Sequence, residues 1–218
     1  MLYAWDFPGV RFLVHPPNNG QSPFVTVHSS ESDDSDELLM QRIALGDERA
    51  FRDLVERHQH LVIGTVARMI GTADAEDLAQ QVFLNVWKSS SRWRPEARFT
   101  TWLLTITKRL VFNESRRRSR SRLIPQARDE ETVPEYPSTL PGPDRQLADR
   151  ELHLAIESAM ALLPENERMA VVLRRYEGMP YEEIAAVIGV SLPAVKSLLF
   201  RARNTLKESL GPFLDERK

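Results

Sequence analysis

A stretch near the C-terminus, residues 179–206, limits what this chain can fold into more than any other part of the sequence. Its first half, residues 182–188, predicts a short helix, because Ile184 and Ile188 are four positions apart and therefore share one face. Gly189 follows, and glycine accepts the positive φ of a sharp turn after a helix because it has no Cβ. The stretch therefore predicts a helix, a tight turn and a second helix.

The second helix of this stretch has one apolar and one basic side. Ser191 can act as its N-cap, and Pro193 fits the first turn, where the N–H that proline lacks would have no helical partner. The apolar side consists of Val195, Leu198, Leu199, Ala202 and Leu206. The opposite side carries Lys196, Ser197, Arg201, Arg203, Asn204 and Lys207. We interpret the pair as a helix-turn-helix whose second helix lies in a DNA groove. The alternative is an ordinary helical hairpin with a solvated basic face.

The composition is that of a soluble globular protein, with 42% hydrophobic and 28% charged residues in a chain of 218. This length suits one large domain or two small ones. The absence of cysteine excludes disulfides, thiolate metal sites and cysteine nucleophiles, and it suits a reducing cytoplasm. The five histidines are scattered, so we expect no metal site and no cofactor. No apolar run is long enough to span a membrane, and no signal-peptide pattern is present.

Residues 1–35 predict a disordered or weakly ordered extension. Proline and glycine interrupt its aromatic residues, and an acidic run from Glu31 to Glu37 follows without a basic residue. The first thirty residues are either a flexible arm or upstream sequence that is not made in the cell.

Residues 36–122 predict a first helical domain, because their apolar residues recur at helical spacing. Within this domain, Asp74 is a suitable N-cap for a helix over residues 75–88. One side of that helix is polar and carries Asp77, Gln80, Gln81, Asn85 and Lys88. This side is either plain solvent surface or a docking strip for a helix of a partner protein.

The end of the first domain is strongly basic and contains aromatic residues. Ten basic residues and two acids lie between residues 92 and 122, which gives a net charge of +8. Such a strip predicts a surface for single-stranded nucleic acid, because cations follow phosphates and rings stack on unpaired bases. The alternative is that the aromatic residues belong to the core. We expect a core position for Trp102, which shares a helical row with Ile106 and Leu110. Trp93 lies in a proline-containing loop, and there we expect contact with a ligand at least as much as a core position.

Residues 123–146 predict an acidic, proline-rich linker, with a net charge of −3 from Pro125 to Gln146. An acidic tether does not bind the nucleic acid that its basic neighbours bind, so it is either an inert spacer or the occupant of a basic channel.

Residues 147–212 predict a second helical domain, followed by a tail over residues 213–218. Its first helix buries Leu152, Ile156, Ala159 and Leu163, and Pro164 opens the next helix. That helix turns Met169, Val172, Leu173 and Tyr176 inward and ends at Gly178, and Gly211 and Pro212 end the last helix. We therefore predict an all-α chain of two small helical domains joined by the linker, the second domain containing the helix-turn-helix.

In this order, the features resemble the bacterial RNA polymerase sigma factors of the extracytoplasmic-function (ECF) type over residues 36–210. Four motifs carry the resemblance: DAEDLAQQVFLNVW (74–87), FTTWLLTITKRLVFNESRRR (99–118), LPENERMAVVLRRYEGMPYEEIAAVIGVS (163–191) and VKSLLFRAR (195–203). The resemblance implies a factor that binds the polymerase core, directs it to promoters and helps to open the duplex.

The resemblance also implies roles for individual residues. The largest-subunit clamp helices of the polymerase core would contact Asp77, Gln80, Gln81 and Asn85. The −10 element would contact Arg92, Trp93, Arg94, Arg98, Phe99, Lys108, Arg109, Arg116 and Arg117. The −35 element would contact Ser191, Ala194, Lys196, Ser197, Arg201 and Arg203. Further expected partners are the polymerase flap, an RNA exit channel that takes the linker, and an anti-sigma factor. The protein would be cytoplasmic, and a membrane-bound anti-sigma factor would be able to hold it at the membrane.

Several positions depart from the family pattern. Arg109 stands where asparagine is common, Leu198 where arginine is common, and Pro180 where a serine cap is usual. Pro193 and Ala194 replace the usual Gly-Thr. Base preferences at the two promoter elements are therefore not carried over. The alternative function is a stand-alone helix-turn-helix regulator that binds its site without polymerase. An enzyme is not indicated, because the sequence shows no paired carboxylates, no nucleophile with a base and no phosphate-binding loop.

Overall fold

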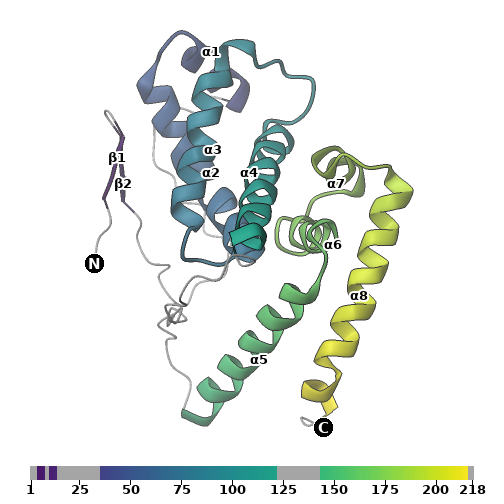
Figure 1. The fold of residues 1–218 in the computed structure, drawn as a ribbon. Helices are drawn as coiled ribbons and strands as arrows, with labels where there is room; N and C mark the ends of the chain where they lie inside the picture. Colours follow the sequence, from purple (N-terminus) through teal and green to yellow (C-terminus); the bar gives the residue numbers. More distant parts are fainter. Residues whose placement is uncertain (1–3, 8–9, 14–34, 122–142, 216–218) are drawn as a thin grey trace.

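The computed structural model of the chain describes residues 4–7, 10–13, 35–121 and 143–215. The first two segments form an antiparallel hairpin of β1 (Ala4–Phe7) and β2 (Val10–Leu13), in which Ala4 pairs with Leu13. The predicted all-α class did not include this hairpin. The all-α prediction is confirmed for the two large described segments, which are helical and form the two domains in Figure 1.

The first domain consists of α1 (Asp36–Ala44), α2 (Glu48–Ile70), α3 (Ala75–Ser89), the 3-10 turn η1 (Ser90–Arg92) and α4 (Phe99–Ser121). Short polar side chains start the first two helices. The Ser35 hydroxyl accepts a hydrogen bond from the Leu38 N–H, and the Asp47 carboxylate accepts from the N–H groups of Arg49 and Ala50. The fully buried core of this domain includes Leu39, Leu54, Val62, Phe83 and Leu103.

The prediction that the Asp74 side chain caps α3 is wrong. Asp74 occupies the N-cap position, but its side chain makes no capping hydrogen bond and pairs instead with Arg118 of α4. A guanidinium competes well for a carboxylate because both partners of the pair are ionised.

The second domain consists of α5 (Pro143–Leu162), α6 (Glu165–Val171), the π-helical turn η2 (Val172–Tyr176), α7 (Tyr181–Ile188) and α8 (Leu192–Asp215). Helix α5 runs beside the long helix α8, with α6 and α7 at their far end (Figure 1). Pro164 precedes α6 as predicted, and Ala159, Leu163, Met169, Leu173 and Val195 are buried.

Three details of the second domain differ from the predictions. Helix α5 begins at Pro143, inside the predicted linker, because proline is well placed in the first turn of a helix. Helix α8 continues through Gly211 and Pro212 to Asp215, since Gly211 does not take the positive φ that ends a helix. Tyr176 is 44% exposed and does not face inward. Residues 123–142 of the predicted linker and residues 216–218 of the predicted tail lie outside the described residues.

The two domains pack against each other. Helix α4 of the first domain lies along α7 of the second, and the end of α2 meets α6 and η2. The buried apolar side chains of both domains belong to one continuous cluster. Among the described residues, no single helix is both long and apolar enough to cross a membrane; one bent pair, Tyr181–Ile188 with Leu192–Gly211, meets that test by length and composition only.

The buried core predicts the effect of Leu54→Ala, which removes most of a fully buried side chain from α2. We expect the free energy of unfolding to fall by about 2–5 kcal/mol, because the cavity adds to the lost transfer energy. The matched control is Leu45→Ala at a position that is 90% exposed, where a change within about 0.5 kcal/mol is expected. Denaturant unfolding followed by circular dichroism measures both variants, and equal losses would contradict the assigned core.

Candidate nucleic-acid and partner interfaces

The helix-turn-helix forms as the sequence predicts. Gly189 ends α7 in the left-handed conformation with φ of 79°, and the Ser191 hydroxyl accepts a hydrogen bond of 3.4 Å from the Ala194 N–H. Val195, Leu198 and Ala202 are buried. The outward side of α8 carries the exposed residues Ser191, Lys196, Ser197, Arg201, Arg203, Asn204 and Lys207, while Ala194 is half-buried at its edge. The basic side chains of this helix therefore do not pack into the core.

Arg201 is tied to the body of the second domain. Its Nε donates a hydrogen bond of 2.7 Å to Oε1 of Glu167, a residue of α6 that is only 7% exposed. A buried carboxylate needs such a partner, since a charge without one is costly to bury. The Arg201 side chain remains 56% exposed although its Nε is bonded to Glu167. This pairing could not be seen in the sequence, because the two residues are 34 positions apart.

Helix α4 has three sides with different surroundings. Leu103, Leu104, Thr107 and Val111 are buried in the first domain. A second side faces solvent and carries Arg109, Asn113, Arg116 and Arg120, which recur at intervals of four, three and four residues. We call this set the open stripe of α4. Trp102 and Ile106, both half-buried, continue the open stripe toward the start of the helix.

The third side of α4 lies against α7, and two predicted DNA contacts are engaged there. Arg98, just before α4, pairs with Glu183 at 3.3 Å, and the Thr101 hydroxyl donates to the same carboxylate at 3.1 Å. The Lys108 ammonium donates a hydrogen bond of 2.5 Å to the backbone carbonyl of Ile188. Burial lowers the pKa of Lys108, and the nearby charges of Arg109 and Arg116 lower it further.

The aromatic residues around the start of α4 form a packed cluster. Trp93 and Phe99 are 9% and 5% exposed, and their ring centroids lie 6.3 Å apart in an edge-to-face arrangement. Trp93 also meets Trp102 at 6.2 Å, and Phe99 meets His58 of α2 at 5.0 Å. The interpretation of Trp93 as a stacking ligand is therefore not supported by its position. Trp102, expected in the core, is the member of this group that is only half-buried.

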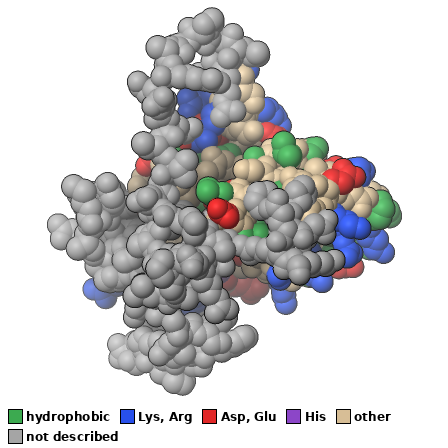
Figure 2. Space-filling model, turned by 90° about the horizontal axis from the view of Figure 1, so that it is seen from below, with side chains coloured by type: hydrophobic (Ala, Val, Ile, Leu, Met, Phe, Trp, Pro, Cys, Tyr) green, Lys and Arg blue, Asp and Glu red, His purple; other side chains and the backbone are tan. Residues whose placement is uncertain are grey.

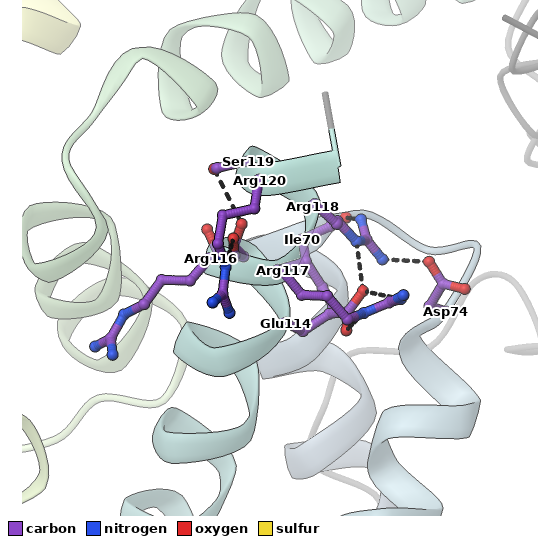
Figure 3. Close-up of polar contacts among 9 residues, drawn as sticks. Ile70, Asp74, Glu114, Arg116, Arg117, Arg118, Ser119 and Arg120 are labelled. Carbon is purple, nitrogen blue, oxygen red and sulfur yellow. Dashed lines mark hydrogen bonds and ion pairs between the residues drawn. The ribbon is translucent and has the colours of Figure 1, made fainter. Parts of the chain in front are cut away.

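The arginines at the end of α4 divide into two groups (Figure 3). Arg117 makes two hydrogen bonds of 2.7 Å to the two carboxylate oxygens of Glu114, and Arg118 adds one of 3.0 Å. These bonds, led by the one from Arg117, lower the pKa of Glu114 to about 2. Arg118 also donates to the Ile70 carbonyl at 2.7 Å and pairs with Asp74, so it ties α4 to the turn between α2 and α3. Arg116 extends away from this group and is exposed.

The polar side of α3 lies on the surface as predicted. Asp77, Gln81 and Lys88 are exposed, and Gln80 and Asn85 are half-buried beside Leu84. The spacing places Asp77, Gln80, Gln81, Leu84 and Lys88 on one side of the helix. The remaining predicted contacts, Arg92 and Arg94, are exposed in the turn and loop before α4.

Figure 2 shows one face of the molecule. Its described part carries lysine and arginine side chains together with aspartate and glutamate, and hydrophobic side chains in small groups. Within the described residues, no group of three or more His, Cys, Asp or Glu side chains is placed to hold a metal ion.

Comparison with protein families matches both domains. Residues 54–121 match "Sigma-70 region 2", and residues 153–206 match "Sigma-70, region 4". The chain is 31% identical over 195 residues to the RNA polymerase sigma-H factor of Pseudomonas aeruginosa, covering 84% of this chain and 97% of that protein. It is 29% identical over 184 residues to the ECF RNA polymerase sigma-E factor of Escherichia coli K12, covering 83% and 96%.

Solved structures share the fold. The structure of CnrH in complex with the cytosolic domain of CnrY has a TM-score of 0.59 and 28% identity, and covers 82% of this chain and 99% of that chain. The sigma factor RpoE of Bartonella quintana, in complex with the anti-sigma factor NepR, has a TM-score of 0.61 and 24% identity, and covers 75% and 98%. The second likeness concerns the fold alone.

The chain belongs to the ECF sigma factors of RNA polymerase. It is therefore a factor for promoter-specific initiation of transcription, with the polymerase core and promoter DNA as its partners, and it is not a stand-alone regulator. By its family the protein is not an enzyme. The resemblance seen in the sequence motifs is confirmed.

The low pKa of Glu114 predicts a pH-dependent contribution to stability. The folded-state pKa of about 2 lies below the ordinary value of 4.5, so the stabilisation is complete above pH 4.5 and is lost as the pH falls toward 2. We expect Glu114→Gln to lower the free energy of unfolding at pH 7 by about 1–2 kcal/mol, a value reduced for solvent screening. The difference from the unaltered protein should shrink between pH 4.5 and pH 3 in denaturant titrations.

The control for this experiment is Glu96→Gln, which alters an exposed acid in the loop before α4. It should change stability little at any pH in this range. A Glu114→Gln effect that is constant from pH 7 to pH 3 would contradict the role of the charged pair.

Proposed function

We propose that the protein binds polymerase core through the polar side of α3, contacts the −10 element with the region around α4, and contacts the −35 element with α8. The observation that carries this proposal is that two separate domains each present an exposed basic helix side, the open stripe of α4 and the outward side of α8. The match of these domains to sigma regions 2 and 4 supports it.

For core binding, Asp77, Gln80, Gln81 and Asn85 offer a carboxylate and three amides on or beside one side of α3. Amides donate and accept hydrogen bonds, so they can satisfy the polar groups of an opposing helix, while Asp77 selects a basic one. Half-buried Leu84 adds apolar contact in the middle of the strip. These features suit the clamp helices of the polymerase as the partner.

For the −10 element, the exposed candidates are Arg92, Arg94, Arg109 and Arg116. Their guanidinium groups would bind the phosphates of an opened strand, and half-buried Trp102 lies next to them on α4. Buried Trp93 and Phe99 would act indirectly, by fixing the position of the loop and of the first turn of α4. Arg98, Lys108 and Arg117 have partners within the chain, although the side chains of Arg98 and Arg117 remain 76% and 73% exposed.

For the −35 element, α8 would enter the major groove with Lys196, Ser197, Arg201 and Arg203 toward the DNA. Ser191 and Ala194 lie at the N-terminal end of the helix, where side chains contact base edges in other helix-turn-helix proteins. Leu198 is buried, so it packs beneath α8 and does not face the DNA.

The remaining partners are proposed by family likeness. CnrH, a structural neighbour, is in complex with the cytosolic domain of CnrY. We propose that an anti-sigma factor binds this protein in the cytoplasm and that such a factor can hold it at the membrane. The acidic residues of the 123–146 segment suit the RNA exit channel, and the second domain suits the polymerase flap.

The test of the proposed function is run-off transcription with purified core polymerase and a library of promoter fragments. We expect promoter-specific transcripts that require the protein. Asp77→Ala should reduce core binding by about tenfold to a hundredfold, since losing a charged hydrogen bond at an interface costs about 1.5–3 kcal/mol. Lys196→Ala with Arg203→Ala should leave core binding unchanged and reduce promoter binding.

Matched controls separate these effects from general damage. Glu56→Ala removes an exposed acid from α2, and Arg175→Ala removes an exposed base from η2. Both should behave like the unaltered protein. If the protein never joins core polymerase, or if the α3 and α8 variants fail at the same step, the assigned roles are wrong.

The phosphate contacts predict a salt dependence. We expect the slope of log affinity against log salt concentration, for the polymerase complex on promoter DNA, to fall by about 1 in Arg116→Ala, because each neutralised phosphate releases nearly one counterion. Arg175→Ala should keep the original slope. Fluorescence anisotropy between 50 and 300 mM potassium chloride measures it, and an unchanged slope would remove Arg116 from the DNA contact.

A further inference from the structure

We propose that Glu167, a residue of α6, is a positioning residue for the recognition of the −35 element by α8. Its carboxylate holds the Arg201 guanidinium in one orientation, so that the Nη end of the guanidinium meets the edge of a guanine in the major groove. The inference rests on the proposed function of α8. It adds a residue outside that helix which decides how one side chain of the helix reads the DNA.

Glu167 is a buried acid in the first turn of α6. It is 7% exposed, and Met169 and Ala170 of the same helix are fully buried. Its Oε1 accepts the hydrogen bond of 2.7 Å from the Nε of Arg201, at a place where α6 and α8 pack against each other. Because a carboxylate without a partner is costly to bury, Glu167 holds this guanidinium strongly.

The bond to Glu167 fixes the direction of the Arg201 side chain. Nε lies between the flexible stem of the arginine and the carbon that carries both Nη groups, and the guanidinium is planar. A hydrogen bond at Nε therefore orients the whole group, while it uses one of the five N–H donors. The side chain is 56% exposed, so its stem is tied to the domain although much of its surface lies in solvent.

Arg201 stands on the flank of α8 that faces α6, at the edge of the outward side. Ser197 precedes it by four positions and Asn204 follows it by three, so the three exposed residues are neighbours on the helix. Lys196 and Arg203 are also exposed, but within the described part of the chain neither makes a side-chain hydrogen bond or an ion pair. Of these three basic residues, Arg201 is therefore the one whose position is set before DNA binds.

A held arginine and a free arginine read DNA differently. A free guanidinium is attracted to the nearest phosphate, and phosphate contacts carry no sequence information. A guanine presents two acceptors, O6 and N7, in the major groove, and the fork of an arginine matches them. Because Glu167 has already ordered Arg201, the guanine contact avoids the loss of side-chain freedom that a free arginine would suffer. We therefore expect the pair to raise the preference for guanine and not the affinity for DNA of any sequence.

The test is a selection with the complete holoenzyme, formed from core polymerase and the full-length protein. Promoter fragments that the unaltered holoenzyme uses are randomised over the −35 element, bound, recovered and sequenced. We expect guanine to be preferred at one or more positions, by about fivefold to a hundredfold over the other bases. Arg201→Ala should lose this preference at one position, which assigns the base that Arg201 contacts.

Removal of the Glu167 carboxylate should affect the same position. Glu167→Ala should reduce the guanine preference there by about twofold to tenfold, since the arginine must then be ordered on binding. Preferences at the other positions should stay unchanged. Glu167→Gln keeps the size of the side chain and an oxygen that accepts from Nε, so it should retain more of the preference. In the Arg201→Ala background, Glu167→Gln should have no further effect.

The matched control is Glu182→Ala, which removes an exposed acid from α7 and changes the net charge by the same amount. Both charge changes should strengthen binding to DNA of any sequence, because repulsion of the phosphates decreases. Only Glu167→Ala should alter the guanine preference. Thermal unfolding of each variant checks the fold, and Glu167→Gln carries the test if Glu167→Ala does not fold.

The free protein gives a second readout. In NMR spectra of the chain labelled with nitrogen-15, the Nε–H of Arg201 should exchange slowly with water, because it is bonded to a buried carboxylate. The Nε–H of exposed Arg203 is the comparison and should exchange fast. Glu167→Ala should make the two rates alike, and a fast rate for Arg201 in the unaltered protein would overturn the inference.

The outcomes of the selection separate the positioning role from the proposed function. If Arg201→Ala changes no base preference, or if both Glu167 variants keep the full guanine preference, the positioning role is overturned and α8 keeps its assignment. If the unaltered holoenzyme selects no sequence over the −35 element, the proposed function of α8 is itself wrong. A loss that Glu182→Ala shares, or one that is spread over all positions, shows a general effect and also overturns the inference.

Discussion

The structure depends on the way that helix α4 divides its three sides. One side supplies Leu103, Leu104 and Val111 to the core of the first domain, and a second lies under α7 of the second domain. The third side, the open stripe, keeps its arginines in solvent. Because a helix has about 3.6 residues per turn, each side is set by residues three and four positions apart. A single helix thereby joins the first core, the domain interface and a basic surface.

The arginines of this protein have different tasks although they are equal in formal charge. Arg118 donates to the Ile70 carbonyl and pairs with Asp74, and Arg168 donates to the Met69 carbonyl, so both hold elements together. Arg201 pairs with buried Glu167, and Arg117 pairs with Glu114. Arg109 and Arg116 remain on the open stripe. The count of basic residues between residues 92 and 122 therefore overstates the charge that is free to meet a nucleic acid.

The separation of structural from accessible residues also applies to the aromatic side chains. Trp93 lies in a basic loop, where a ring suits an unpaired base, yet it is buried against Phe99 and Trp102. A loop position in sequence says nothing about whether the loop folds back onto a core. The helical row of Trp102 predicted a core position, and the structure leaves that residue half-buried where it continues the open stripe.

The sequence by itself determined the helices, the helix-turn-helix and the family, because these follow from local spacing: Ile184 with Ile188, Gly189 at the turn, and Ser191 as the cap. It also predicted the polar side of α3 and the outward side of α8. Only the tertiary structure decided which charged residues are engaged, such as Arg98 and Lys108 with α7, or Asp74 with Arg118. These partners lie 44 to 85 positions apart, and no local periodicity encodes which surfaces meet when two amphipathic units share one apolar cluster.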